Sequence, residues 1–191
     1  MAVEQESNTR LAELIARLNT AMDIADCTAR CHAVKDILHD ITESGGDFIP
    51  DNFLQPAPDR YARRLVHRDP ALRYSIVAMV WGNGQGTPLH DHDGHWCVEC
   101  VYRGRIRVVS YSPLGDTEAS VVDFKPEREV IAGIAEAGAL IPPFDYHTIA
   151  NADQTPSVTL HVYGEELNQC TIFVPTKGGY QREVRHLSYT P

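Results

Sequence analysis

The sequence lacks features that mark several large classes of protein. Its longest apolar runs, such as "SIVAMVWG", are far shorter than the roughly 20 residues that a transmembrane helix needs. Positive charge is also scarce, because 17 Lys and Arg stand against 26 Asp and Glu, for a formal net charge of -9. Nucleic acids and anionic membranes are bound by clustered basic residues. We therefore expect neither of them as a partner.

The N-terminal sequence MAVEQESNTR does not show the basic-then-apolar pattern of a secretory signal. Cysteine is sparse, and the five cysteines are an odd number, which does not indicate a framework of paired disulfides. We expect a cytoplasmic protein with reduced thiols. At 191 residues, 43% of them hydrophobic, the chain can bury a core without disulfides.

Hydrophobic periodicity predicts two helices followed by a β-rich region. Apolar residues recur with helical spacing over residues 8–22 and 27–43, and Gly45 and Gly46 predict the end of the second helix. From about residue 60, short apolar runs alternate with Gly, Pro, Asn and Asp, a pattern typical of antiparallel barrels. We expect a mainly β fold in a single domain over residues 1–191. Its helical portion should cover about 1–48 and its jelly-roll β-barrel about 60–191.

The stretch "GTPLHDHDGHWC", residues 86–97, is rich in possible metal ligands. His90 and His92 are separated by one residue, so on a strand both imidazoles point to the same face. Two imidazoles side by side can supply half of a metal site, although two histidines on a solvated strand face give the same pattern. His95 is at an odd spacing from His90, and we do not expect it to be a ligand.

The histidines form part of a longer pattern. The spacing of the first cupin motif is met by Gly84, His90, His92, Cys97 and Gly104, and that of the second by Pro142, His147 and Asn151. Cys97 replaces the usual Glu, and Phe144 and Glu136 replace two usual glycines. The chain thus resembles the cupin superfamily. This resemblance implies a cupin-type barrel with His90, His92 and His147 as metal ligands, and imidazole suits Fe, Cu, Ni and Zn alike.

From about Tyr61 to Phe173 the chain resembles the cysteine dioxygenase family of thiol dioxygenases. The resemblance implies an Fe(2+) cofactor at the three histidines and oxidation of a small thiol to its sulfinic acid by O2. Animal-type members have a cysteine at the position of Cys97, joined by a thioether bond to a tyrosine of an S-x-H-x-Y segment. That segment reads Thr159-Leu-His161-Val-Tyr163 here, with Thr in place of Ser.

The alternation of Thr159, His161 and Tyr163 is informative without the resemblance. On a strand the three side chains share one face, where a hydroxyl can hold the imidazole and the imidazole can orient the phenol. We predict catalytic roles for these three residues and for Cys97. A polar, solvent-facing strand edge is the alternative interpretation.

The family also has a substrate-carboxylate arginine in a Y-x-R segment upstream of the H-x-H pair. Tyr61-Ala-Arg63 fits this segment, 27 residues before His90. A guanidinium offers a planar fork of donors that matches a carboxylate. We predict that Arg63 and Tyr61 bind substrate, because the neighbouring Arg64 would point the opposite way on an extended segment.

Several points stay open at the level of sequence. L-cysteine is the first candidate substrate, and 3-mercaptopropionate and mercaptosuccinate are the alternatives. Two other classes of protein also stay open: a metal-cupin oxygenase that acts on a non-thiol substrate, and a non-catalytic cupin. Trp96 stands where animal-type members have His and could alter the mouth of the pocket or be an ordinary buried aromatic. Glu99 shares a strand face with Cys97 and could be a further ligand or a polar group of the barrel interior. We expect a monomer or a homodimer.

Overall fold

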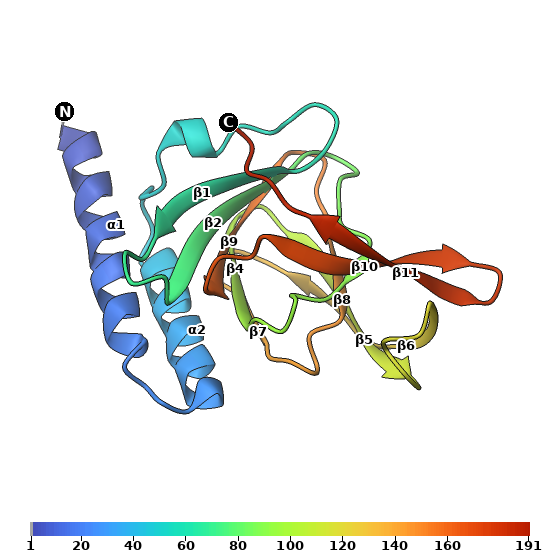
Figure 1. The fold of residues 1–191 in the computed structure, drawn as a ribbon. Coiled ribbons are helices and arrows are strands. Elements are labelled where there is room, and N and C mark those ends of the chain that lie inside the picture. The colour runs from blue at the N-terminus through green and yellow to red at the C-terminus, as the bar shows by residue number, and fades with distance from the viewer. Residues whose placement is uncertain (1) are drawn as a thin grey trace.

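The computed structural model describes residues 2–191, with side chains from residue 9 onward. Helices α1 (Ala2–Ala21) and α2 (Cys27–Glu43) and a short 3-10 helix (Asp51–Phe53) precede the strands (Figure 1). The strands are β1 (Ala62–Arg68), β2 (Tyr74–Trp81), β3 (Leu89–His90), β4 (Cys97–Arg103), β5 (Ile106–Leu114), β6 (Val121–Ala132), β7 (Ala137–Leu140), β8 (His147–Asn151), β9 (Ser157–Gly164), β10 (Gln169–Thr176) and β11 (Gly179–His186).

Helix α2 forms where the sequence supplies a cap, an apolar stripe and a stop. The Asp26 carboxylate accepts a hydrogen bond of 2.8 Å from the backbone N–H of Ala29, which satisfies one of the free donors of the first turn. The buried stripe includes Val34, Ile37, Leu38 and Ile41, as the periodicity predicts. Gly45 follows the helix at φ +73°, a conformation that glycine adopts without strain.

The strands form two antiparallel sheets that enclose the interior of the molecule. One has five strands in the order β1-β2-β9-β4-β7, and the other closes into a barrel in the order β10-β11-β6-β5-β8-β3. Helix α2 contacts β4 and β7, and Figure 1 shows both helices on one side of the five-stranded sheet, away from β10 and β11. The five-stranded sheet therefore has one face toward the helices and the other toward the second sheet.

The central strands of the five-stranded sheet are buried on both faces, which explains their continuous apolar runs. In β2, Ile76, Ala78 and Val80 belong to the core beneath the helices, whereas Met79 and Trp81 belong to the core between the sheets. Strands β4 and β9 alternate in the same way. Chemically active side chains on their inner face therefore lie between the two sheets.

The predicted fold class is confirmed: the protein is mainly β, with a barrel and two N-terminal helices. The predicted run at residues 74–81 coincides with β2. The short apolar runs at 120–124 and 129–133 join into the single strand β6, because a bulge opposite Ser110 and Tyr111 lets its pairing with β5 continue. Strand β3 ends at His90, so His92 lies beyond it rather than on the same strand.

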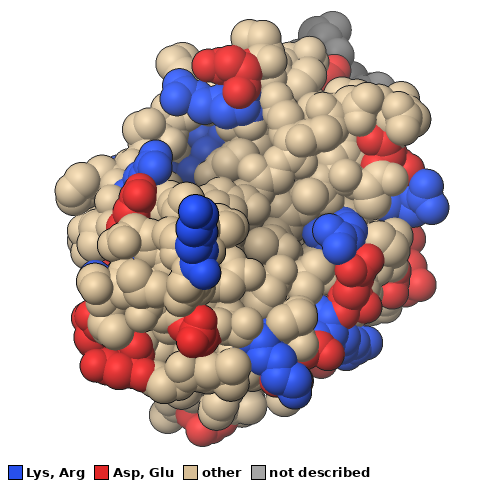
Figure 2. All heavy atoms as spheres, turned by 90° about the vertical axis from the view of Figure 1, so that its right-hand side faces the viewer, with Lys and Arg blue, Asp and Glu red and all other residues tan. Residues whose placement is uncertain are grey.

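The face turned toward the viewer in Figure 2 carries basic and acidic side chains side by side, without a large area of either sign. Among the described residues, no helix combines the length and the apolar character that crossing a membrane requires.

Candidate metal centre

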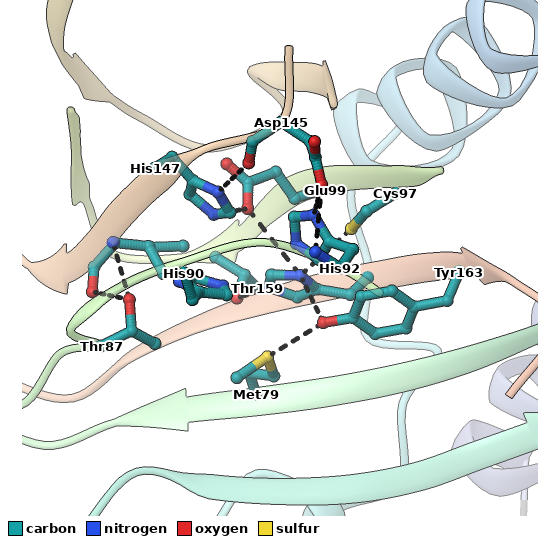
Figure 3. Close-up of polar contacts among 12 residues, drawn as sticks. Met79, Thr87, His90, His92, Cys97, Glu99, Asp145, His147, Thr159 and Tyr163 are labelled. Carbon is teal, nitrogen blue, oxygen red and sulfur yellow. Dashed lines mark hydrogen bonds and ion pairs between the residues drawn. The ribbon is translucent and has the colours of Figure 1, made fainter. Parts of the chain in front are cut away.

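Three histidines from distant parts of the chain meet between the sheets. His90 at the end of β3 is paired in register with His147 on β8, and His92 follows two residues later. One ring nitrogen from each of the three lies within 4.8 Å of the others. Figure 3 shows the rings grouped beside β9. The structure therefore brings together the three residues that the motif spacing predicts as ligands.

Each of the three rings is oriented by a hydrogen bond at Nδ1. His90 Nδ1 lies 3.1 Å from the carbonyl oxygen of Pro88, and His147 Nδ1 lies 3.1 Å from that of Asp145. His92 Nδ1 lies 3.2 Å from the carboxylate Oδ2 of Asp145. An oxygen acceptor at Nδ1 requires the proton there, which leaves Nε2 of each ring with a free lone pair, the state in which imidazole binds a metal.

Asp145 is a site residue that the sequence did not identify. The residue is 3% exposed, and its Oδ2 also accepts a hydrogen bond of 3.0 Å from the backbone N–H of His92. This contact positions His92 beyond the end of β3. The sequence signal for Asp145 was its position two residues before His147. Nothing in the sequence links it to His92, which is 53 positions away.

The surroundings of the cluster disfavour the charged form of two of its imidazoles. Burial and the neighbouring His92 imidazole lower the pKa of His90 to about 3. Burial and the nearby His90 and His92 rings likewise hold the pKa of His147 well below its ordinary value. Three imidazoles at this spacing form a donor set that fits a divalent transition metal.

The inner face of β9 carries a chain of hydrogen bonds. Trp81 Nε1 donates to Thr159 Oγ1 at 2.9 Å, and Thr159 Oγ1 lies 2.7 Å from His161 Nε2. Since the indole can only donate, the hydroxyl proton of Thr159 is available for His161 Nε2. His161 then carries its proton on Nδ1, the nitrogen 3.3 Å from the hydroxyl of Tyr163. The three alternating residues thus lie on one face, in contact with one another, as predicted.

Cys97 lies beside this chain. On β4 it is the register partner of Tyr163 on β9, and its sulfur is 3.7 Å from His161 Nδ1. Burial and the nearby Glu99 carboxylate raise the pKa of the Cys97 thiol, so it is protonated. Cys100, three positions later, points to the other face of β4 and contacts α2 through the carbonyl of Leu38. The two cysteines therefore cannot act as a dithiol pair.

A cavity of about 270 Å³ opens onto the cluster, and His90, Arg63 and Tyr61 all line it. The Arg63 guanidinium is buried, donates to the carbonyl of Leu167 at 2.7 Å and lies 4.6 Å from the centre of the Tyr189 ring. Arg64 points the opposite way, as expected, and donates to the carbonyl of Gln55.

The three residues that the sequence left open occupy different environments. Trp96 belongs to the core beneath the helices and is an ordinary buried aromatic, away from the cavity mouth. His95 is outside the histidine cluster and lines another cavity beside Trp96. Glu99 points inward, with Oε2 3.8 Å from both His147 Nε2 and His161 Nδ1 (Figure 3). Burial raises the pKa of Glu99 to about 7.

Comparison with known proteins places this chain in a family. The family model described as cysteine dioxygenase type I matches residues 4–175. Cysteine dioxygenase type 1 from Danio rerio is 23% identical over 116 residues, which cover 60% of this chain and 56% of that protein. The Homo sapiens protein of the same name is 24% identical over 115 residues, with the same coverage. The match thus spans little more than half the length of these curated relatives.

Solved structures with a similar fold have low sequence identity to this chain. The protein TT1209 from Thermus thermophilus is 18% identical, with a TM-score of 0.47 and coverage of 60% of this chain and 92% of that chain. A cupin 2 conserved barrel domain protein from Rhodopseudomonas palustris is 17% identical, with a TM-score of 0.46 and coverage of 65% and 74%.

Proposed function

The chain belongs to the cysteine dioxygenase type I family, and we propose that it is a non-haem iron(II) thiol dioxygenase. It would oxidise a small carboxylated thiol, with L-cysteine as the first candidate, to the sulfinic acid. One observation supports this most strongly: the three-histidine cluster shares its interior with Cys97 and with the Thr159, His161 and Tyr163 chain. These are the residue types that the family resemblance implies for the active site, and here they lie close to one another.

The donor set fits iron, although three imidazoles alone would also accept copper, nickel or zinc. The choice of Fe(2+) rests on the family. When bound by His90, His92 and His147, iron would supply the redox chemistry through which both atoms of O2 are added to the thiol sulfur. The balance RSH + O2 → RSO2H needs no other reductant.

The residues of the chain itself would bind and orient the substrate. The Arg63 guanidinium and the Tyr61 hydroxyl would hold the carboxylate in the cavity of about 270 Å³, on the side where His90 is accessible. A buried guanidinium that already has one amino group engaged by Leu167 loses little freedom on binding, and its planar fork suits a carboxylate.

Tyr163 would act as a hydrogen-bond donor to the bound molecules. Burial and the neighbouring Cys97 thiol raise the pKa of Tyr163 well above its ordinary value, so the phenol keeps its proton. Its hydroxyl accepts a hydrogen bond from His161 Nδ1 and donates one to the weak acceptor Met79 Sδ at 3.7 Å. A stronger hydrogen-bond acceptor beside the imidazole cluster would take the hydrogen bond of the Tyr163 hydroxyl in place of the Met79 sulfur.

Loading the purified protein with iron(II) under anaerobic conditions and then measuring oxygen uptake tests this function. The thiol panel should include L-cysteine, 3-mercaptopropionate and mercaptosuccinate, and the product should be identified by mass spectrometry. We expect one O2 consumed per sulfinate formed. Metal-free protein and a His147→Ala variant are the controls. Failure of every thiol on the panel to stimulate oxygen uptake would contradict the proposal.

A further inference from the structure

Arg63 is a buried cation that makes no ion pair among the described residues. The residue is 5% exposed, and within the described part of the chain its side chain donates only to the carbonyl of Leu167. The cavity that it lines contains no Asp or Glu among its lining residues. Burying a charge without a counter-ion is unfavourable, so another group must stabilise the guanidinium where it stands.

Two aromatic rings lie close to this guanidinium. Its central carbon is 4.6 Å from the centre of the Tyr189 ring and 5.9 Å from that of the Tyr163 ring. Both separations are within the range of a cation–π interaction, and the shorter one is to Tyr189. A ring attracts the cation through its face, whereas a carboxylate partner would occupy the N–H groups themselves. The rings therefore stabilise the charge and leave most of the planar fork free for a ligand.

The segment that follows β11 brings Tyr189 to this position. The backbone N–H of Thr190 donates to the carbonyl of Arg63 at 2.6 Å, and the backbone N–H of Arg63 donates to Thr190 Oγ1 at 3.1 Å. Strand β1 is at the edge of its sheet, so these bonds pair the segment with that edge at residue 63 itself. Figure 1 shows the segment running from the end of β11 toward β1.

The Tyr189 ring is also held at its hydroxyl. Its Oη donates to Glu166 Oε1 at 3.0 Å, and the same carboxylate is paired with Arg68 of β1. The next residue after Glu166 is Leu167, whose carbonyl accepts from Arg63 at 2.7 Å. The loop between β9 and β10 thus holds both the guanidinium and the phenol that contacts it. Backbone pairing at one end and a hydrogen bond at the other fix the ring beside Arg63.

We propose that Tyr189 is a positioning residue of the carboxylate site, whose ring stabilises and orients the Arg63 guanidinium without occupying the N–H groups that bind the substrate. This role rests on the proposed function, in which Arg63 binds the carboxylate of a thiol. Because Tyr189 acts through Arg63, its removal should weaken the binding of carboxylated thiols and leave a thiol without a carboxylate unaffected.

Variants that keep or remove the ring at position 189 test the proposal. Tyr189→Phe keeps the ring, whereas Tyr189→Leu and Tyr189→Met replace it with an aliphatic side chain. We expect both ringless variants to raise KM for L-cysteine and 3-mercaptopropionate about fivefold or more, the effect of a desolvated cation–π contact. Their kcat should change less than about twofold. Tyr189→Phe should restore KM to within about twofold of wild type, because the ring is the group that contacts Arg63.

A double variant shows whether Tyr189 acts through Arg63. In the Arg63→Gln background, Tyr189→Leu should raise KM no further, because the group that it positions is already absent. A purely structural role would give losses that add. Tyr180→Leu is the matched control, because Tyr180 is a half-buried tyrosine of β11 that packs on Phe124 instead. It should lower the thermal midpoint without changing KM.

A binding measurement that needs no turnover separates this role from the proposed function. Protein loaded with cobalt(II) under anaerobic conditions is titrated with L-cysteine, 3-mercaptopropionate and cysteamine, which has no carboxylate, and binding is followed by the thiolate-to-cobalt absorption band. The ringless variants should bind the two carboxylated thiols about fivefold or more weakly and cysteamine as wild type does. Equal weakening for all three thiols, or additive losses in the double variant, would overturn the role of Tyr189. Absence of sulfinate with every thiol would contradict the proposed function alone.

Discussion

Cys97 and Tyr163 are direct cross-strand neighbours, on β4 and β9, and both side chains approach the same nitrogen of His161. Directly opposed residues on one face of an antiparallel pair have Cβ atoms about 4.5–5.5 Å apart, within reach of a covalent bridge between a thiol and an aromatic ring. Both groups are buried and have raised pKa values, so neither is charged. The register of two strands thus brings together the residues that the family resemblance links.

We predict a thioether bond between Cys97 and Tyr163 in protein that has been exposed to metal and O2. The bond replaces one hydrogen on sulfur and one on the phenol ring, and O2 takes up these two protons and two electrons. Intact mass spectrometry under denaturing conditions should find a species lighter by two hydrogen atoms. Cys97→Ser and Tyr163→Phe variants should keep the full mass. A wild-type protein that keeps its full mass after aerobic iron treatment would show that the bond does not form.

Arg63 and Arg64 form a matched pair for testing the carboxylate site, because the cavity side of β1 carries the first and the opposite side the second. Arg63→Gln should raise KM for carboxylated thiols about tenfold or more, the loss of one charged hydrogen bond. The KM of Arg63→Lys should lie between those of wild type and Arg63→Gln, because lysine keeps the positive charge but lacks the planar fork of donors. Arg64→Gln should leave KM unchanged and lower only the thermal midpoint. Equal KM values for all these variants would exclude Arg63 as the carboxylate partner.

Asp145 should control metal affinity although it is outside the group of three histidines that would hold the metal. It orients His92 through two contacts of its Oδ2, at 3.0 Å to the backbone nitrogen and 3.2 Å to Nδ1. Substituting a residue that hydrogen-bonds a metal ligand typically lowers metal affinity by about 10–100-fold. We expect Asp145→Asn to weaken iron or cobalt binding by a factor in that range in competition with a chelator. Circular dichroism should confirm that the variant is folded, and undiminished affinity would argue against the orienting role.

The Asp69 carboxylate makes the free energy of unfolding depend on pH. A hydrogen bond of 2.7 Å from Arg73 Nε is the main cause that lowers the pKa of Asp69 from its ordinary 3.8 to about 2, and the residue is 3% exposed. As the pH falls below about 4, the unfolded chain takes up this proton before the folded one, so the contribution of Asp69 is present above that pH and is lost toward pH 2. Asp69→Asn should cost about 1–2 kcal/mol near neutrality.

Urea unfolding of wild type and Asp69→Asn between about pH 2 and 7 measures this effect. The difference in free energy of unfolding should shrink toward the acidic end of this range. Asp40→Asn is the control, because its ion pair with Arg17 is exposed and should contribute less than about 0.5 kcal/mol. A difference between Asp69→Asn and wild type that stays constant over this range would show that the carboxylate does not titrate as described.

Much of the architecture was predictable, because it depends on local patterns. The second helix ends at Glu43, just before the two glycines that predict its end, and β2 covers the apolar run at 74–81. The alternation of Thr159, His161 and Tyr163 was enough to place them on one face. The short β3 was not predictable from H-x-H spacing, because His92 is held by Asp145 instead of a strand ladder.

The sequence by itself determined which side chains share a face. A period of two on a strand sets the direction of each side chain relative to its own backbone, and that is local information. Only the tertiary structure decided which faces meet. Strand order and sheet closure put Asp145 against His92 and Cys97 opposite Tyr163, and they left Glu99 unpartnered beside His147. These distances depend on how strands far apart in the chain align, and no local pattern encodes that alignment.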